Sequence, residues 1–317
     1  MQIHFLGTSS GCPSLSRNVA ATAVEFEHTK TWLLVDCGEG TQHQIMKSPL
    51  AAYHLGVILI THLHGDHCYG LPGLLASISM AGRKEPVHLV APKKVIEFVE
   101  ATLELTEMET AFSLIFTAWE TLDNQQVLEF SSCLVTIHPL QHRVPCVGFK
   151  IIEKGVPNKL RIDELNAAGI GSGPHYNQLQ RGQDVIYNHQ LLKSADFTYP
   201  SWQPRKVLIC GDNEKPSLLA SVCQDVDLLV HEATFTSADL LRVGEHTGHS
   251  DAKRVAQFAE QCKIPKLALI HFSSRYHGPG MLEPLAQEAQ QYYHGQLILA
   301  EDGLTLSISK HLNLNFI

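Results

Sequence analysis

The sequence predicts an α/β protein in which two similar sheet-and-helix halves pack as a sandwich. Short apolar runs that suit buried strands alternate with helical patterns in both halves of the chain. The 317 residues, 44% of them hydrophobic, are enough to bury a large core. This length permits one large domain or two small ones, and we expect a single domain over residues 1–317.

Apolar periodicity defines the elements in order along the chain. Alternating or continuous apolar runs predict strands at 2–6, 21–27, 31–36, 56–60, 87–90, 114–117, 134–138, 148–153, 206–210, 227–231, 266–271 and 296–300. Apolar residues at helical spacing predict helices at 42–47, 71–81, 93–107, 251–262 and 282–293. Either Ser250 or Asp251 would cap one of these helices, because a short polar side chain can accept a hydrogen bond from the first turn.

The stretch 155–200 departs from this pattern. It is rich in glycine and polar residues, and it offers only short helical patterns, at 161–168 and near 176–181. A long segment of this kind inside a compact domain is usually functional when it is ordered. We therefore expect an inserted arm or a long surface loop.

Composition narrows the class of protein. No apolar run of about 18 residues is present, so no membrane-spanning helix is predicted. The eight cysteines form no CxxC pair and the first residues lack a signal-peptide pattern, which predicts reduced thiols and a cytoplasmic location. The net charge of −8 argues against a nucleic-acid-binding protein, although bound metals or a local cluster of basic residues can offset it.

Three histidines and one aspartate stand within six residues, directly after the apolar run 56–60. They are His62, His64, Asp66 and His67. This cluster falls at the carboxyl end of a predicted strand, which is the edge at which sites form in open α/β sheets. Imidazole and carboxylate groups without thiolate suit zinc, manganese or iron. The HxHxDH pattern therefore predicts a metal site.

Further candidate ligands follow other predicted strands, namely His142, Asp212, His271 and the pair His231-Glu232. A site with two metals needs ligands from several such places and a carboxylate shared by both ions. Asp212 is the natural bridge, since it has two oxygens to share. Other histidines lack this context, and we expect them to lie on the surface or to bond locally, at 28, 54, 88, 138, 175, 189, 277 and 294.

These motifs and several other segments of the chain resemble those of the ribonuclease Z family. Its members are the tRNA 3′-processing endonucleases of the metallo-β-lactamase superfamily. The HxHxDH pattern alone specifies only the superfamily, whereas His231–Thr234, Gly248–Ser250 and His271–Tyr276 are more specific. Similar segments extend over almost the whole chain, at 5–8, 13–18, 36–44, 61–67 and 70–75. The resemblance implies a metallo-β-lactamase-type αββα sandwich with an inserted arm at 155–192.

The resemblance also implies a role for each site residue. The metal ligands would be His62, His64 and His142 for one zinc ion, Asp66, His67 and His271 for the other, and Asp212 for both. Asp66 would also orient and deprotonate the attacking water. His249, hydrogen-bonded to Glu232, would lie close to the scissile phosphate. Two Zn²⁺ per subunit are expected, with Mn²⁺ or another divalent ion as alternatives and with no organic cofactor.

The implied substrate is precursor tRNA. Metal-activated hydroxide would attack the phosphodiester after the discriminator nucleotide and leave a 3′-hydroxyl on the tRNA. The arm would grip the tRNA in a homodimer, through residues that include Gly173, Pro174 and Arg181. Candidates for contacting the RNA end are Arg17, Asn18 and Arg275. An equally weighted alternative role for these residues is a polar network that stabilises loops.

Two departures from the family pattern bear on these expectations. Asn213 stands where the family usually has threonine, and we expect little effect because Asp212 is kept. The segment 176–181 carries one basic residue, Arg181, where several are usual. We therefore expect fewer phosphate contacts and a weaker dependence of RNA binding on salt.

Two other functions stay open. The same fold supports small-molecule phosphodiesterases and thioester or lactone hydrolases, and the acidic net charge slightly favours this class. A non-catalytic RNA-binding relative is the other alternative, but the intact ligand set argues against it. Cleavage of precursor tRNA at a defined position would distinguish the nuclease from both.

Overall fold

The computed structural model describes residues 1–123 and 126–311, which form two compact units. The larger unit comprises Met1–Ile152 and Lys206–Ile308. Among the described residues, the smaller unit comprises Glu153–Arg205 and residues 309–311. Across the described parts of the chain, no helix combines the length and the apolar composition that a bilayer crossing needs.

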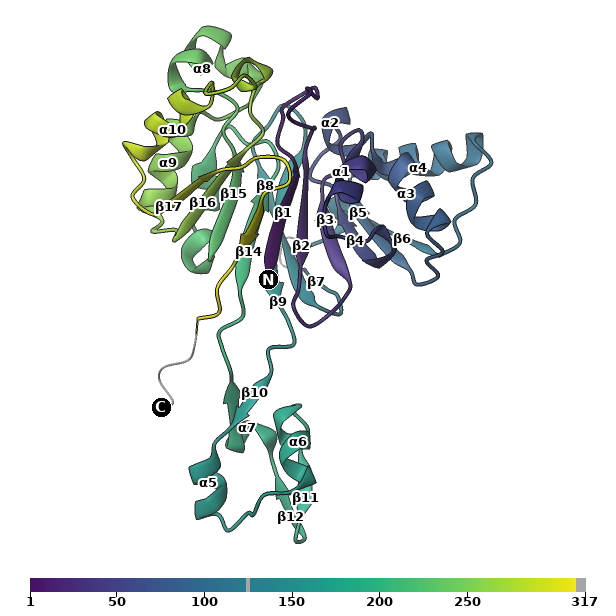
Figure 1. Cartoon of the computed structure of the whole chain (residues 1–317), viewed down its shortest axis with the longest axis vertical. Helices are drawn as coiled ribbons and strands as arrows, with labels where there is room; N and C mark the ends of the chain where they lie inside the picture. Colours follow the sequence, from purple (N-terminus) through teal and green to yellow (C-terminus); the bar gives the residue numbers. More distant parts are fainter. Residues whose placement is uncertain (124–125, 312–317) are drawn as a thin grey trace. The chain divides into compact units, whose positions relative to one another are not determined.

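The first sheet of the larger unit has seven strands in the order β18-β1-β2-β3-β4-β5-β6. Strands β3 to β6 are parallel, so their carboxyl ends lie at one edge. Helices α1, α3 and α4 pack against this sheet (Figure 1). The elements are β1 (Gln2–Gly7), β2 (Ala21–Glu25), β3 (Trp32–Val35), α1 (Thr41–Lys47), β4 (Leu55–Leu59), α2 (Gly65–Cys68), α3 (Leu71–Met80), β5 (Val87–Ala91), α4 (Lys93–Leu105), β6 (Leu114–Ala118) and β18 (Thr305–Ser307).

The second sheet also has seven strands, in the order β17-β16-β15-β14-β9-β8-β7. Strands β14 to β17 are parallel, and α9 and α10 cover their outer face (Figure 1). The elements are β7 (Val127–Glu129), β8 (Cys133–Leu140), β9 (Cys146–Glu153), β14 (Lys206–Cys210), β15 (Leu228–Glu232), α8 (Ser237–Val243), α9 (Ala252–Gln261), β16 (Lys266–Ile270), α10 (Glu283–Gln290) and β17 (Gln296–Leu299).

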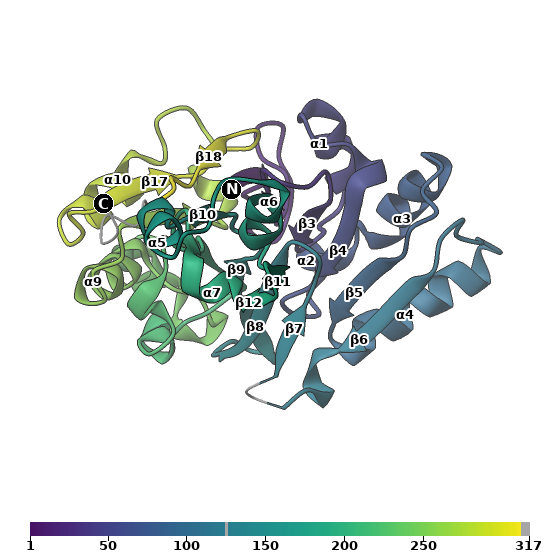
Figure 2. The ribbon, with the colours of Figure 1, turned by 90° about the horizontal axis from the view of Figure 1, so that it is seen from below.

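Side-chain alternation along the strands creates the layers. In β3, Leu33 and Val35 belong to the core between the two sheets, whereas Trp32 and Leu34 belong to the core beneath the helices. Successive strand residues point to opposite faces, so a strand with helices on one side and a second sheet on the other must be apolar throughout. The result is a helix–sheet–sheet–helix sandwich, seen from below in Figure 2, which confirms the predicted fold class.

The smaller unit has a core of its own, formed by Leu165, Ile170, Leu179, Val185 and Leu192. Its elements are β10 (Asn158–Leu160), α5 (Ile162–Ala167), α6 (Pro174–Gln180), β11 (Val185–Tyr187), β12 (Gln190–Leu192), α7 (Ser194–Phe197) and β13 (Thr198–Pro200). Strand β10 pairs with β13, and β11 pairs with β12.

A buried ion pair joins the two chain ends of the smaller unit. Nε of Arg205 donates to Oε2 of Glu153 at 2.8 Å, and both residues are almost fully buried. The indole nitrogen of Trp202 donates to the same oxygen at 3.1 Å. A buried charge pair needs such additional donors, because its desolvation is costly.

Several element boundaries differ from the sequence prediction. The strand expected at 21–27 ends at Glu25, and the helix expected at 282–293 covers only Glu283–Gln290. The short helix expected near 176–181 begins earlier, at Pro174, because proline is favoured in the first turn. Asp251 is the cap of α9, where its carboxylate accepts from the backbone nitrogen of Arg254 at 2.8 Å.

Candidate metal centre

The seven predicted metal ligands gather where strands of both sheets end. The HxHxDH segment follows β4 of the first sheet and continues into α2. The other three ligands follow β8, β14 and β16 of the second sheet. Three overlapping groups of potential metal-binding side chains result, made of His62, His64, His142 and Asp212, of Asp66, His67 and His271, and of Asp212, His249 and His271. The first two groups contain the seven predicted ligands.

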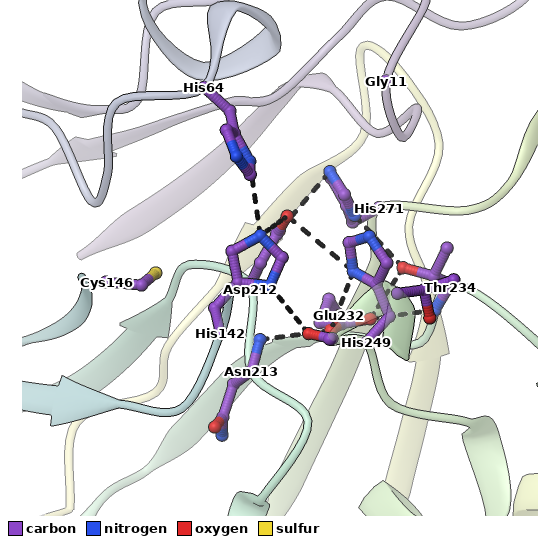
Figure 3. Close-up of polar contacts among 12 residues, drawn as sticks. Gly11, His64, His142, Cys146, Asp212, Asn213, Glu232, Thr234, His249 and His271 are labelled. Carbon is purple, nitrogen blue, oxygen red and sulfur yellow. Dashed lines mark hydrogen bonds and ion pairs between the residues drawn. The ribbon is translucent and has the colours of Figure 1, made fainter. Parts of the chain in front are cut away.

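Asp212 lies between the two groups. Its Oδ2 is 3.6 Å from Nε2 of His62 and 3.6 Å from Nε2 of His142. Its Oδ1 is 3.5 Å from Nε2 of His67 and 3.4 Å from Nε2 of His271. Each carboxylate oxygen therefore faces the histidines of one group, and Figure 3 shows several of these side chains converging.

Within each group the ring nitrogens point toward one another. Nε2 of His62 is 3.1 Å and Nε2 of His142 is 3.3 Å from Nδ1 of His64. In the other group, Nε2 of His67 and Nε2 of His271 are 3.2 Å apart. Lone pairs converging at this spacing suit a shared cation.

The donor set fits divalent metals. Oδ1 of Asp212 is buried and has no hydrogen-bond partner among the described residues. Buried polar atoms without a partner are rare in native proteins, and a bound ion is one explanation for them. Burial alone would raise the pKa of Asp212, but the charges of His271 and His67 outweigh it and hold this pKa well below its usual value. Asp212 is therefore an ionised carboxylate with a free oxygen, as a bridging ligand requires.

The outward ring nitrogens are anchored by neighbouring oxygens. Nδ1 of His142 donates to the carbonyl oxygen of Gly248 at 2.7 Å. Nδ1 of His271 lies 3.1 Å from Oγ1 of Thr234. Such bonds fix the tautomer and ring orientation, leaving Nε2 to face the cluster, and they typically accompany metal-ligating histidines.

Asp36, which the sequence pattern placed at the end of the strand expected at 31–36 without assigning it a role, anchors a ligand in each group. Its Oδ2 accepts from Nδ1 of His67 at 2.7 Å and from Oγ1 of Thr61 at 2.9 Å, and Oγ1 of Thr61 is 2.9 Å from Nδ1 of His62. Asp36 and His271 both adopt φ values of 60°. Non-glycine residues in this region are uncommon and concentrate at functional sites.

His249 lies beside the metal ligands and is held by Glu232. Its Nδ1 is 3.2 Å from Oε1 of Glu232 and 3.7 Å from Oδ2 of Asp212. Burial alone would lower the pKa of His249, but the carboxylate of Glu232 outweighs it and raises this pKa to about 9. Glu232 is itself fixed, since it accepts from the backbone nitrogens of Asn213, Thr234 and Ser250.

Asn213, the departure from the family pattern, connects several site segments. Its Oδ1 lies 3.2 Å from the backbone nitrogen of Gln141, the residue before His142. Its Nδ2 lies 3.0 Å from Nε2 of His231. Its carbonyl oxygen accepts from Oγ of Ser250 at 2.6 Å. No signal in the sequence identified these partners, because they come from three distant segments.

The candidate RNA-binding residues lie in different surroundings. Arg17 is buried, and its Nη1 donates to Oγ1 of Thr8 at 2.6 Å and to the carbonyl oxygen of Ala300 at 2.7 Å. Nδ2 of Asn18 donates to the carbonyl oxygen of Glu39 at 2.8 Å. The guanidinium of Arg275 lies 5.0 Å from the ring centre of Phe235. In the smaller unit, Gly173, Pro174 and Arg181 flank or begin α6. Their contacts with RNA stay predictions.

Comparisons with known proteins identify relatives of this chain. A family described as "Anti-Pycsar protein Apyc1" matches residues 1–157. Ribonuclease Z of Marinobacter nauticus is 42% identical over 320 residues, which cover 99% of this chain and 98% of that protein. Ribonuclease BN of Cronobacter sakazakii is 38% identical over 310 residues, covering 97% of this chain and 100% of that protein.

The crystal structure of the short form of human tRNase Z has a similar fold. It superposes with a TM-score of 0.68 at 29% identity, covering 98% of this chain and 100% of that chain. Sequence similarity therefore extends over nearly the full length of named relatives, and the fold agrees with it. The chain belongs to the ribonuclease Z family of metallo-β-lactamase-fold proteins.

Proposed function

We propose that the protein is a zinc-dependent endoribonuclease that removes the 3′ trailer from precursor tRNA. It would cut the phosphodiester after the discriminator nucleotide and leave a 3′-hydroxyl. The observation that carries this proposal is the position of Asp212, whose two oxygens each face the histidines of one ligand group. The near full-length similarity to proteins named ribonuclease Z supports the choice of substrate.

Two divalent ions held by the seven ligands would activate water near neutral pH and offset the negative charge of the phosphate. Asp66 would orient the attacking water and take its proton. Its Oδ2 is positioned for this task, because it accepts from the backbone nitrogen of Gly11 at 2.8 Å and lies 3.3 Å from Nε2 of His271.

His249 would act as the proton donor to the departing 3′ oxygen. The hydrogen bond between its Nδ1 and Glu232 fixes the ring and favours the protonated form, which leaves Nε2 to donate. Glu232 would act as a positioning residue, since its oxygens are already occupied by backbone and hydroxyl donors.

Zinc is the proposed metal because the ligand set contains five imidazoles, two carboxylates and no thiolate. Mn²⁺ would suit the same set. Elemental analysis of protein purified without added metal identifies the ion and its stoichiometry, for which we expect two per subunit.

Three further proposals concern the arm, the oligomeric state and the cellular location of the protein. We propose that the segment 155–192 is the arm that binds tRNA, and its placement in a compact unit with its own core supports this role. The enzyme would be a homodimer, which sedimentation velocity tests. A cytoplasmic location is supported by eight cysteines that are all free.

One experiment tests the nuclease function. Purified protein is incubated with a trailer-bearing precursor tRNA, with and without chelator, and the new 3′ end is mapped. A single chelator-sensitive cut after the discriminator nucleotide is expected. Hydrolysis of a small aryl phosphodiester without this cut would favour the small-molecule phosphodiesterase. Binding of the precursor without any turnover would favour the non-catalytic relative.

A further inference from the structure

An exposed aromatic ring directly follows the segment that carries four of the candidate metal ligands. Tyr69 follows α2 directly and comes three residues after Asp66. It is 64% exposed, and its hydroxyl makes no hydrogen bond with any residue that the structure describes. Single exposed apolar residues are common on protein surfaces, so the position of this ring decides whether it has a role.

The ring of Tyr69 packs against Gly65. A Cβ atom built on Gly65 would lie 2.1 Å from Cε2 and 2.3 Å from Cζ of Tyr69, so the ring occupies the space that any other residue would fill. Gly65 stands between His64 and Asp66, one candidate ligand of each metal group. The ring therefore packs on the backbone between two candidate ligands, whose Cα atoms are each about 3.8 Å from that of Gly65.

Phe98 of α4 provides a second ring behind the first. The ring centres of Tyr69 and Phe98 are 6.2 Å apart with an interplanar angle of 49°, and Phe98 is 37% exposed. This separation lies within the range of favourable aromatic pairs. The tyrosine ring is therefore supported from two sides while much of its surface stays open to solvent.

We propose that Tyr69, supported by Phe98, stacks on a nucleobase next to the phosphodiester that the enzyme cuts. This inference rests on the proposed ribonuclease function. The nucleotides at the 3′ end of a precursor tRNA are single-stranded, and proteins recognise single-stranded RNA mainly by stacking its bases on aromatic side chains. A ring fixed beside two metal ligands would hold such a base while the adjoining phosphate occupies the centre.

The test uses a precursor tRNA in three forms. One is unmodified, one lacks the base immediately 5′ of the cleaved bond, and one lacks the base immediately 3′ of it. On the unmodified substrate, Tyr69→Ala should lower kcat/KM about 5- to 150-fold, which corresponds to about 1–3 kcal/mol per stacked base. On the substrate that lacks the stacked base, the same substitution should have no effect. Tyr69→Phe keeps the ring and should cleave like the wild type.

Tyr53→Ala is the matched control. Tyr53 is also an exposed tyrosine, at 42%, but it lies in the 3-10 helix Ala52–His54 that precedes β4, whereas the ligands follow β4. This substitution should leave kcat/KM unchanged on all three substrates. The metal content of both Tyr69 variants should match the wild type, and Tyr69→Phe, which keeps the ring pair with Phe98, should also match it in thermal unfolding.

Several outcomes would overturn the proposal. An equal loss on all three substrates would mean that Tyr69 does not contact a base. A loss of metal in either variant, or of thermal stability in Tyr69→Phe, would assign the residue a structural role. A change of molecular mass in sedimentation would assign it to a protein interface. Wild-type protein that fails to cut the precursor would instead refute the ribonuclease function itself, so the two failures are distinguishable.

Discussion

Asp36 accepts a hydrogen bond from Nδ1 of His67 at 2.7 Å. The same carboxylate reaches His62 through the hydroxyl of Thr61. One buried acid therefore orients one candidate ligand in each metal group. Its Oδ1 also accepts from the backbone nitrogen of Thr61 at 2.8 Å, so both carboxylate oxygens act as acceptors.

Asp36→Asn should weaken metal binding about 10- to 100-fold, the usual cost of removing such an outer partner. Asparagine has one acceptor oxygen and one donor nitrogen, so it cannot serve Thr61 and His67 together. Metal affinity is measured by competition with a fluorescent chelator. Glu39→Gln, an exposed acid in the following loop, is the control and should bind metal like the wild type. Unchanged affinity in Asp36→Asn would contradict an orienting role.

Asp212→Ala should remove at least one metal ion per subunit, because it deletes the only side chain whose oxygens face both groups among the described residues. The measurement is elemental analysis after dialysis against buffer without metal. Asp163→Ala, at an exposed position in the smaller unit, provides the control. If Asp212→Ala retained two ions, the bridging role would be refuted.

His249→Ala should keep both metals and lower kcat about 10²- to 10⁴-fold, the contribution expected of a general acid. His246→Ala changes an exposed histidine three residues earlier and should leave kcat unchanged. Metal content is measured on the same samples, because His249 also lies close enough to Asp212 and His271 to share an ion. Metal loss in parallel with activity would identify His249 as a ligand.

The buried ion pair of the smaller unit predicts an acid-sensitive region. Burial alone would raise the pKa of Glu153, but hydrogen bonds from Arg205 and Trp202 outweigh it and lower this pKa. A carboxyl group with a lowered pKa in the folded state stabilises the fold above its unfolded-state pKa, about 4.3, and loses that contribution as the pH falls. The protection factors for amide hydrogen exchange over 153–205, which are corrected for the intrinsic pH dependence of exchange, should therefore fall below this pH.

Glu153→Gln tests the same pair at neutral pH. It leaves the guanidinium of Arg205 buried without its counter-charge, so the unit should lose about 3–5 kcal/mol of stability and most of its response to acid. Glu164→Gln alters an exposed partner of Arg161 and should cost at most about 1 kcal/mol. Equal protection in Glu153→Gln and wild type would show that the pair contributes nothing to stability.

The sequence predicted the layers and the candidate ligands because both depend on local pattern, whereas the division of the ligands into two groups came from the family resemblance. Strand β4 is apolar on both faces, and four ligands follow it within eight residues. His142, Asp212 and His271 were identified because each follows a predicted strand. In parallel sheets, such positions meet at one edge.

The interactions that support the ligands were beyond the reach of sequence patterns. Asp36 approaches His67, and Asn213 approaches Gln141, across 31 and 72 residues of chain. The short strands β10 to β13 each have three residues, too few to show a period of two. No sequence pattern indicated a role for Tyr69, because its packing against Gly65 depends on the folded structure.

The division of ligands between the two sheets has a consequence for folding. His62 and His64 follow a strand of the first sheet and His142 follows a strand of the second, while Asp66 and His67 share their group with His271. Each ion would therefore link the two sheets through its ligands. Metal supply would then affect the stability of the sandwich as well as its catalysis, because a ligand that binds only the folded state stabilises it by an amount that grows with the logarithm of its free concentration above Kd. In cells short of metal, the metal-free protein would unfold and be degraded more readily.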